Sequence, residues 1–131
     1  MNSMIRNLAI VAFSVTAFTS AQAASDTAER AESQYKAAME RCEPLKGNAQ
    51  DVCEKDAKAA RDRAKADDKA ARKGTSEARA DAGESKARAE YQAATERCES
   101  LKGKEQDACE SKAKAALDRR QADADKKRRT N

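Results

Sequence analysis

The sequence contains no histidine and no tryptophan, and it has one proline and four glycines in 131 residues. Without histidine, the chain lacks the side chain most often used as a general acid or base and as a metal ligand. Both phenylalanines and both isoleucines precede residue 24. The remainder has too little apolar material to wall a pocket or to offset the conformational entropy of a globular core. We therefore expect no enzyme, no cofactor and no small-molecule substrate.

Helix-forming residues dominate what is present. Alanine, lysine, arginine, glutamate and glutamine have the highest intrinsic helix propensities, and charged residues make up 38% of the chain. Positive and negative residues are interspersed, except in the basic run at residues 126–129, so the net charge of +4 creates no large field of one sign. The composition predicts an all-α protein, elongated and without a large globular core.

Residues 1–23 have the pattern of a signal peptide. Arg6 precedes an apolar run over residues 8–18, and Ala21-Gln22-Ala23 provides the small residues of a cleavage site. The run is shorter than the roughly 20 apolar residues that span a bilayer. We expect cleavage between Ala23 and Ala24, a mature protein in the periplasm, and no membrane span after cleavage.

The rest of the chain is organised by a repeat. Residues 35–67 align without a gap to residues 91–123, an offset of 56, and 22 of the 33 aligned positions are identical. Each copy has two cysteines separated by ten residues around a Leu-Lys-Gly turn signal. Apolar residues recur in steps of three and four on both sides of the turn, which predicts two antiparallel helices. Each copy is therefore expected to form a helical hairpin.

The cysteine spacing predicts a disulfide in each hairpin, Cys42–Cys53 and Cys98–Cys109. In an antiparallel hairpin each pair would lie at the same height on facing helices, whereas in one continuous helix the cysteines would stand about 16 Å apart. Four cysteines allow three connectivities, so pairing between copies or between chains stays open. Metal binding is disfavoured by the C-x10-C spacing, and redox catalysis by the lack of a C-x-x-C motif.

Capping signals and glycines set the expected boundaries. Asp26 is expected to cap the first helix and Asn48 the second, while the corresponding Lys104 provides no cap. The predicted units are a first hairpin over residues 24–73, a weakly structured hinge over 74–83, a second hairpin over 84–125 and a basic tail over 126–131. Within the hinge, Asp81 resembles a new helix cap.

Two sets of residues are candidate contacts. Tyr35 and Tyr91 are the only aromatic residues after residue 23, and each is expected either to cover the alanine seam of its hairpin or to contact a partner. The basic run could bind the phosphates of a nucleic acid, a lipid or a lipopolysaccharide, or could simply be a solvated end. Its members are Lys126, Lys127, Arg128 and Arg129.

The repeated unit resembles a group of small, uncharacterised exported proteins of proteobacteria that are often labelled TolA-like. The matching residues of the first copy are Tyr35, Ala38, Cys42, Leu45, Gly47, Asp51, Cys53, Ala57 and Ala59. This resemblance implies a periplasmic location and no catalytic residue. We expect a non-enzymatic protein of the cell envelope that acts as a spacer or binds unidentified envelope proteins. The alternatives are a binder of anionic surfaces and a protein of thiol or metal stress.

Overall fold

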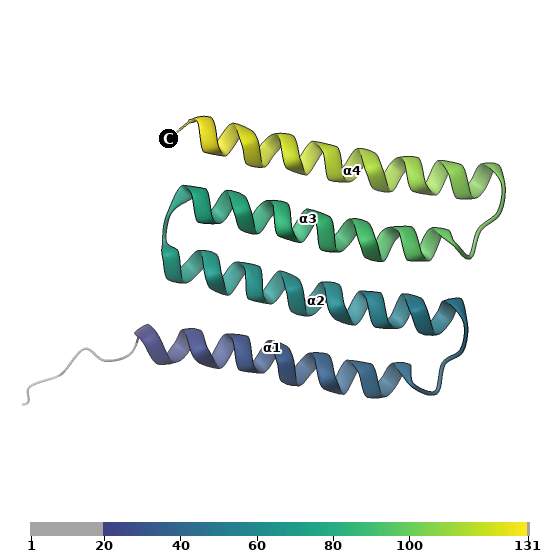
Figure 1. The fold of residues 1–131 in the computed structure, drawn as a ribbon, viewed down its shortest axis with the longest axis horizontal. Helices are drawn as coiled ribbons and strands as arrows, with labels where there is room; N and C mark the ends of the chain where they lie inside the picture. Colours follow the sequence, from purple (N-terminus) through teal and green to yellow (C-terminus); the bar gives the residue numbers. More distant parts are fainter. Residues whose placement is uncertain (1–19, 131) are drawn as a thin grey trace, which may run out of the picture.

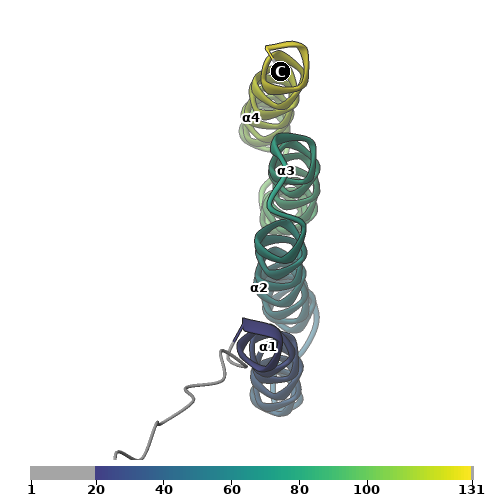
Figure 2. The ribbon, with the colours of Figure 1, turned by 90° about the vertical axis from the view of Figure 1, so that its left-hand side faces the viewer.

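The computed structural model describes residues 20–130, with side chains from residue 26 onward, and contains four helices. They are α1 (Ser20–Cys42), α2 (Asn48–Lys73), α3 (Ser76–Cys98) and α4 (Lys104–Arg129). Successive helices run antiparallel and lie side by side (Figure 1). Each helix packs only against its neighbours in the sequence. Seen from the end, the helices form a single layer (Figure 2). The predicted all-α fold is confirmed.

The repeat extends over whole helices. The bounds of α1 and α2, moved along the chain by the offset of the repeat, coincide with the bounds of α3 and α4. Residues 20–34 and 76–90 differ at most positions in sequence, yet both begin their helices at the same place. The duplicated unit is therefore the complete hairpin, and the two hairpins lie next to each other through α2 and α3.

Both predicted disulfides are present. Cys42–Cys53 and Cys98–Cys109 each join Cα atoms 5.6 Å apart, closer than helices usually pack. Small alanine side chains along the same helices permit this approach. Cys42 and Cys98 are the largest fully buried side chains among the described residues, and nearly all the other buried ones are alanines. The described part of the chain thus has no large apolar core, as the composition predicts.

The predicted hinge over residues 74–83 is wrong. Only Gly74 and Thr75 lie between α2 and α3, and residues 76–83 belong to α3. Gly74 adopts the left-handed conformation with φ 66°, and its N–H donates to the carbonyl of Ala70. The Thr75 hydroxyl accepts from the N–H of Ala78 at 3.1 Å and so caps α3. Asp81 lies inside α3, where it caps nothing.

The other predicted caps also differ. Asp26 lies inside α1, which begins at Ser20. Gly47 and Gly103, both with φ 57°, precede α2 and α4, and neither helix has a side-chain cap. The Asn48 amide instead donates to the backbone carbonyl of Glu96 on α3, at 3.1 Å. Asn48 therefore links the two hairpins and does not cap α2.

The seam between α2 and α3, called the central seam below, is filled by alanines. Ala59 packs with Ala89 and Ala93, and a second cluster contains Ala70, Ala78 and Ala82, with Ala66 against it. Ion pairs border these clusters: Lys55–Glu96 at 3.7 Å, Arg63–Glu90 at 3.6 Å, Lys86–Asp67 at 2.6 Å, and Arg97–Asp56. This seam makes one layer of the two hairpins without a covalent link.

The predicted signal peptide falls mostly on residues 1–19, which lie outside the described residues. Within the described part, none of the helices has the length and apolar character to span a membrane. The two disulfides are consistent with an oxidising, exported location.

Candidate functional site

The four cysteines form the two disulfides of the hairpins. Each lies at the turn end of its hairpin, and all four are bonded, so the described residues contain no free thiol. No cluster of three or more histidine, cysteine, aspartate or glutamate residues suited to a metal ion occurs among the described residues.

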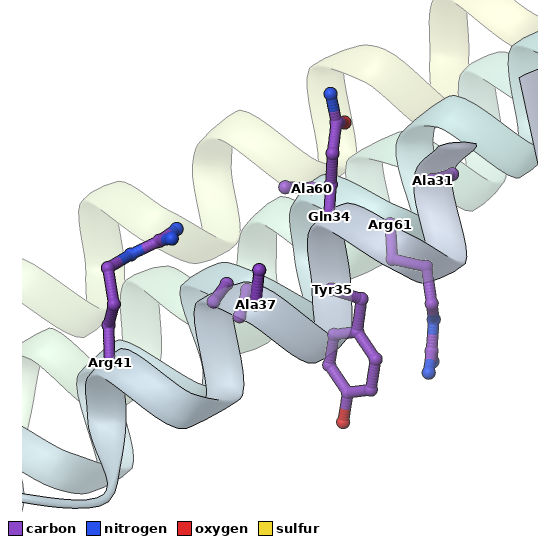
Figure 3. Close-up of a pocket in the computed structure, with 9 residues that line it drawn as sticks. Ala31, Gln34, Tyr35, Ala37, Arg41, Ala60 and Arg61 are labelled. Carbon is purple, nitrogen blue, oxygen red and sulfur yellow. The ribbon is translucent and has the colours of Figure 1, made fainter.

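The first hollow lies between α1 and α2 and has a volume of about 380 Å³. Its floor is made mainly by alanines, including Ala31, Ala57 and Ala60. Figure 3 shows the side chains of Gln34 and Arg41 extending to one side of these helices. An apolar floor with polar arms at its rim is suited to a side chain or headgroup that is partly apolar.

Tyr35 and Arg61 extend together toward the other side (Figure 3). The guanidinium of Arg61 lies 4.3 Å from the centre of the Tyr35 ring, which is a cation–π contact. Arg61 also donates two hydrogen bonds to Asp62, at 3.0 and 2.8 Å, which raise the pKa of the guanidinium. Burial raises the pKa of Asp62, but bonds from Arg61 and Lys58 outweigh it and leave that pKa below its usual value.

Tyr91 occupies the equivalent position on α3 and is likewise half-buried. Leu117 stands where the first hairpin has Arg61, so the cation–π pair is not repeated. The two tyrosines are on α1 and α3, which do not pack against each other. Tyr35 and Tyr91 therefore belong to separate surfaces and do not form a joint aromatic site.

A second hollow, of about 620 Å³, lies between α3 and α4 near their turn. Leu101 is a half-buried large apolar residue in its lining. Arg97, Glu105 and Lys112 contribute charges of both signs. Arg97 is already paired with Asp56 of α2. This hollow combines an apolar side chain with a mixed rim and has no dominant charge.

A third hollow, of about 290 Å³, lies between the same helices toward the other end, and we call it the basic hollow. Arg79 and Lys86 from α3 line it, opposite Arg120 and Lys127 from α4. Asp123 is the one acidic residue in its lining. Ala80, Gly83 and Ala124 complete the lining, and these small residues leave the space between the cations.

The predicted basic tail is part of α4, which continues to Arg129. Arg128 bonds to Asp81 at 2.8 Å, to Glu84 at 2.9 Å and to Asp125 at 2.9 Å. These bonds raise the pKa of Arg128, and bonds from Arg88 and Arg128 lower the pKa of Glu84. Lys127 lines the basic hollow, while Lys126 and Arg129 are exposed on the final turn. The prediction of a separate tail is thus wrong, and the run is divided among different surroundings.

Comparison with known proteins finds no match: no family model, no curated protein and no solved structure is similar to this chain. The resemblance to the TolA-like group stays a prediction.

The basic hollow was missed by the sequence analysis, which considered only the terminal run. A signal for it exists in the departures of the second copy from the first. Arg120 and Lys127 stand where the first copy has Ala64 and Ala71. Such replacements can be recognised as one site only when the structure shows that they face the same space.

Proposed function

We propose that the protein is a non-enzymatic helical interaction module of the periplasm, which presents a rigid layer of helices to other envelope proteins. The observation that carries this proposal is the single layer itself (Figures 1 and 2). In a bundle of two layers, each helix has one buried face. Here no described helix covers either of the two broad faces of the layer. A large surface for docking is therefore available along helices of 23 to 26 residues.

Rigidity supports the same proposal. The disulfides fix the turn end of each hairpin, and the central seam fixes one hairpin against the other. A preorganised surface loses less conformational entropy when it binds than a flexible one. A role as spacer follows from the same features, because a layer of helices about 39 Å long keeps its shape. The thiol-stress alternative has less support, because its cysteines are bonded.

Photocrosslinking in intact cells tests the proposal. A photoreactive amino acid would be placed at one exposed position on each helix: Gln34, Lys58, Arg88 and Lys114. We expect discrete adducts of defined mass from some positions and none from others, because a partner covers one part of the layer.

The matched control carries the same photoreactive residues in a chain whose four cysteines are replaced by alanine. Its adducts should weaken as the hairpins loosen. Absence of an adduct from all four positions, with the protein found folded in the periplasm, would contradict the proposal. Recovery of the protein in the cytoplasmic fraction would contradict its location.

A further inference from the structure

The charge of the basic hollow distinguishes the second hairpin from the first. The hollow is lined by four cations and one carboxylate. At the equivalent places on α1 and α2, one repeat earlier in the chain, the first hairpin has Arg30 as a cation and both Asp67 and Asp68 as carboxylates. Alanines, Ala23, Ala64 and Ala71, stand at the positions of the other three cations. The same backbone arrangement thus surrounds an excess of positive charge in one copy only.

Asp68 shows how the first copy uses this space. Its carboxylate is buried, with 3% of the side chain exposed, and it pairs with Arg72 at 2.7 Å. The second copy has Ala124 there, which is also buried but uncharged. The second hairpin therefore has an uncharged alanine where the first has a buried carboxylate, and more cations surround it.

Three cations of the basic hollow, Arg79, Lys86 and Arg120, keep donors for a ligand. Arg79 donates through Nη1 to the backbone carbonyl of Gly74 at 3.1 Å. Arg120 pairs with Glu90 at 3.1 Å through one nitrogen, and Lys86 pairs with Asp67 at 2.6 Å. An arginine has five N–H donors and a lysine has three, so a bond to one carboxylate leaves other donors of the same side chain available. Asp67 is 59% exposed and Glu90 33% exposed. Ion pairs that are open to solvent on at least one side are weak, and they can share their cations with a second anion.

We propose that the basic hollow binds a phosphate group, either as a small free phosphate compound or as the headgroup of a lipid. Arginine binds phosphate oxygens through paired N–H donors, and lysine adds a compact charge. The volume of about 290 Å³ is at the lower limit of small-molecule sites, and it suits one or two phosphate groups. This site is additional to the protein-binding role proposed above and does not depend on it.

The test uses the full mature chain and two probes: inorganic pyrophosphate in solution, and phosphatidylcholine vesicles with or without phosphatidic acid. The variant R120A/K127A introduces alanine at both positions, as the first hairpin has at Ala64 and Ala71. We expect it to weaken binding at least tenfold. The control K114A/R129A removes the same charge from the same helix at exposed positions outside the hollow, and it should leave binding within twofold of wild type.

A third variant is expected to change the affinity in the opposite direction. D123N removes the carboxylate from the lining and should strengthen binding severalfold. Pyrophosphate binding in solution identifies a free phosphate ligand, and binding only to vesicles with phosphatidic acid identifies a lipid. Circular dichroism of each variant verifies the helices.

Three results would overturn the proposal. One is no binding of either probe. Another is an equal loss in R120A/K127A and K114A/R129A, which would indicate attraction by net charge alone. The third is binding of pyrophosphate or of phosphatidic acid vesicles that R120A/K127A leaves unchanged, which would place anion binding elsewhere on the molecule.

Discussion

The central seam and the two seams within the hairpins are held by different means. Each hairpin is closed by a disulfide with Cα atoms 5.6 Å apart. The central seam has no covalent link and depends on alanine clusters, the bond from Asn48 and partly exposed ion pairs. The repeated features, the turn and the disulfide, thus close each hairpin, whereas the contact between the hairpins depends on residues of α2 and α3 that are not repeated on the outer helices.

Those changes are visible when α3 is compared with α1, its counterpart in the first copy. Ala82 and Ala89 are buried in the central seam. The equivalent residues of α1 are Asp26 and Ser33, both exposed. On the far edge, Lys126 of α4 corresponds to Ala70 of the central seam. The outer helices α1 and α4 therefore have polar residues at positions where α3 and α2 have alanines in the central seam. The end repeats of helical arrays have polar outer faces in the same way.

The largest loss of stability is expected when two buried alanines of α3 are replaced by the polar residues that α1 has at the equivalent positions. The double substitution A82D/A89S places a charge and a hydroxyl where the central seam has alanines. We expect a loss of about 4 kcal/mol in the free energy of unfolding, because a carboxylate without a partner is taken out of water. Chemical denaturation measures the loss, and scattering should show the two hairpins separating.

The converse substitution D26A/S33A serves as the control. Both residues are exposed, so the free energy of unfolding should change by no more than about 0.5 kcal/mol. Equal effects of the two double substitutions would contradict the role assigned to the central seam.

Removal of a disulfide should have the next largest effect. Replacing Cys98 and Cys109 by alanine is expected to cost about 2–3 kcal/mol, because the unfolded chain loses the constraint of a closed loop. The pair Cys42–Cys53 has the same sequence separation, 11 residues, so its removal should cost a similar amount. Thermal melting of each double variant under oxidising conditions, compared with the wild type, measures the two losses separately.

Hydrogen exchange adds resolution to this prediction. Amides near the turn of the altered hairpin should exchange faster, while those around Ala59 and Ala89 in the central seam keep more of their protection. Uniform loss of protection across all helices would show that the seams are not separable.

The sequence was sufficient to predict the hairpins and their pairing. A cysteine spacing that recurs in both copies, together with a glycine turn, has few solutions in three dimensions. The sequence did not predict the central seam. Ala82 and Ala89 alternate with charged residues as they would on a solvated helix, and Gly74-Thr75 is equally compatible with a linker and with a tight turn. The basic hollow was missed for a related reason, since Arg79 and Arg120 belong to different helices and lie far apart in the chain.

The smallest effect concerns Asn48, a difference between the copies that only the central seam explains. Its amide donates to the carbonyl of Glu96 across that seam, whereas the equivalent Lys104 begins the outer helix α4 and is exposed. N48A should cost about 1 kcal/mol in the free energy of unfolding, the usual value of one such bond, and K104A should cost almost nothing. Thermal denaturation of both variants measures the difference. A cost shared equally by the two would mean that Asn48 acts on its own turn, and the seam would then depend on alanine packing and ion pairs alone.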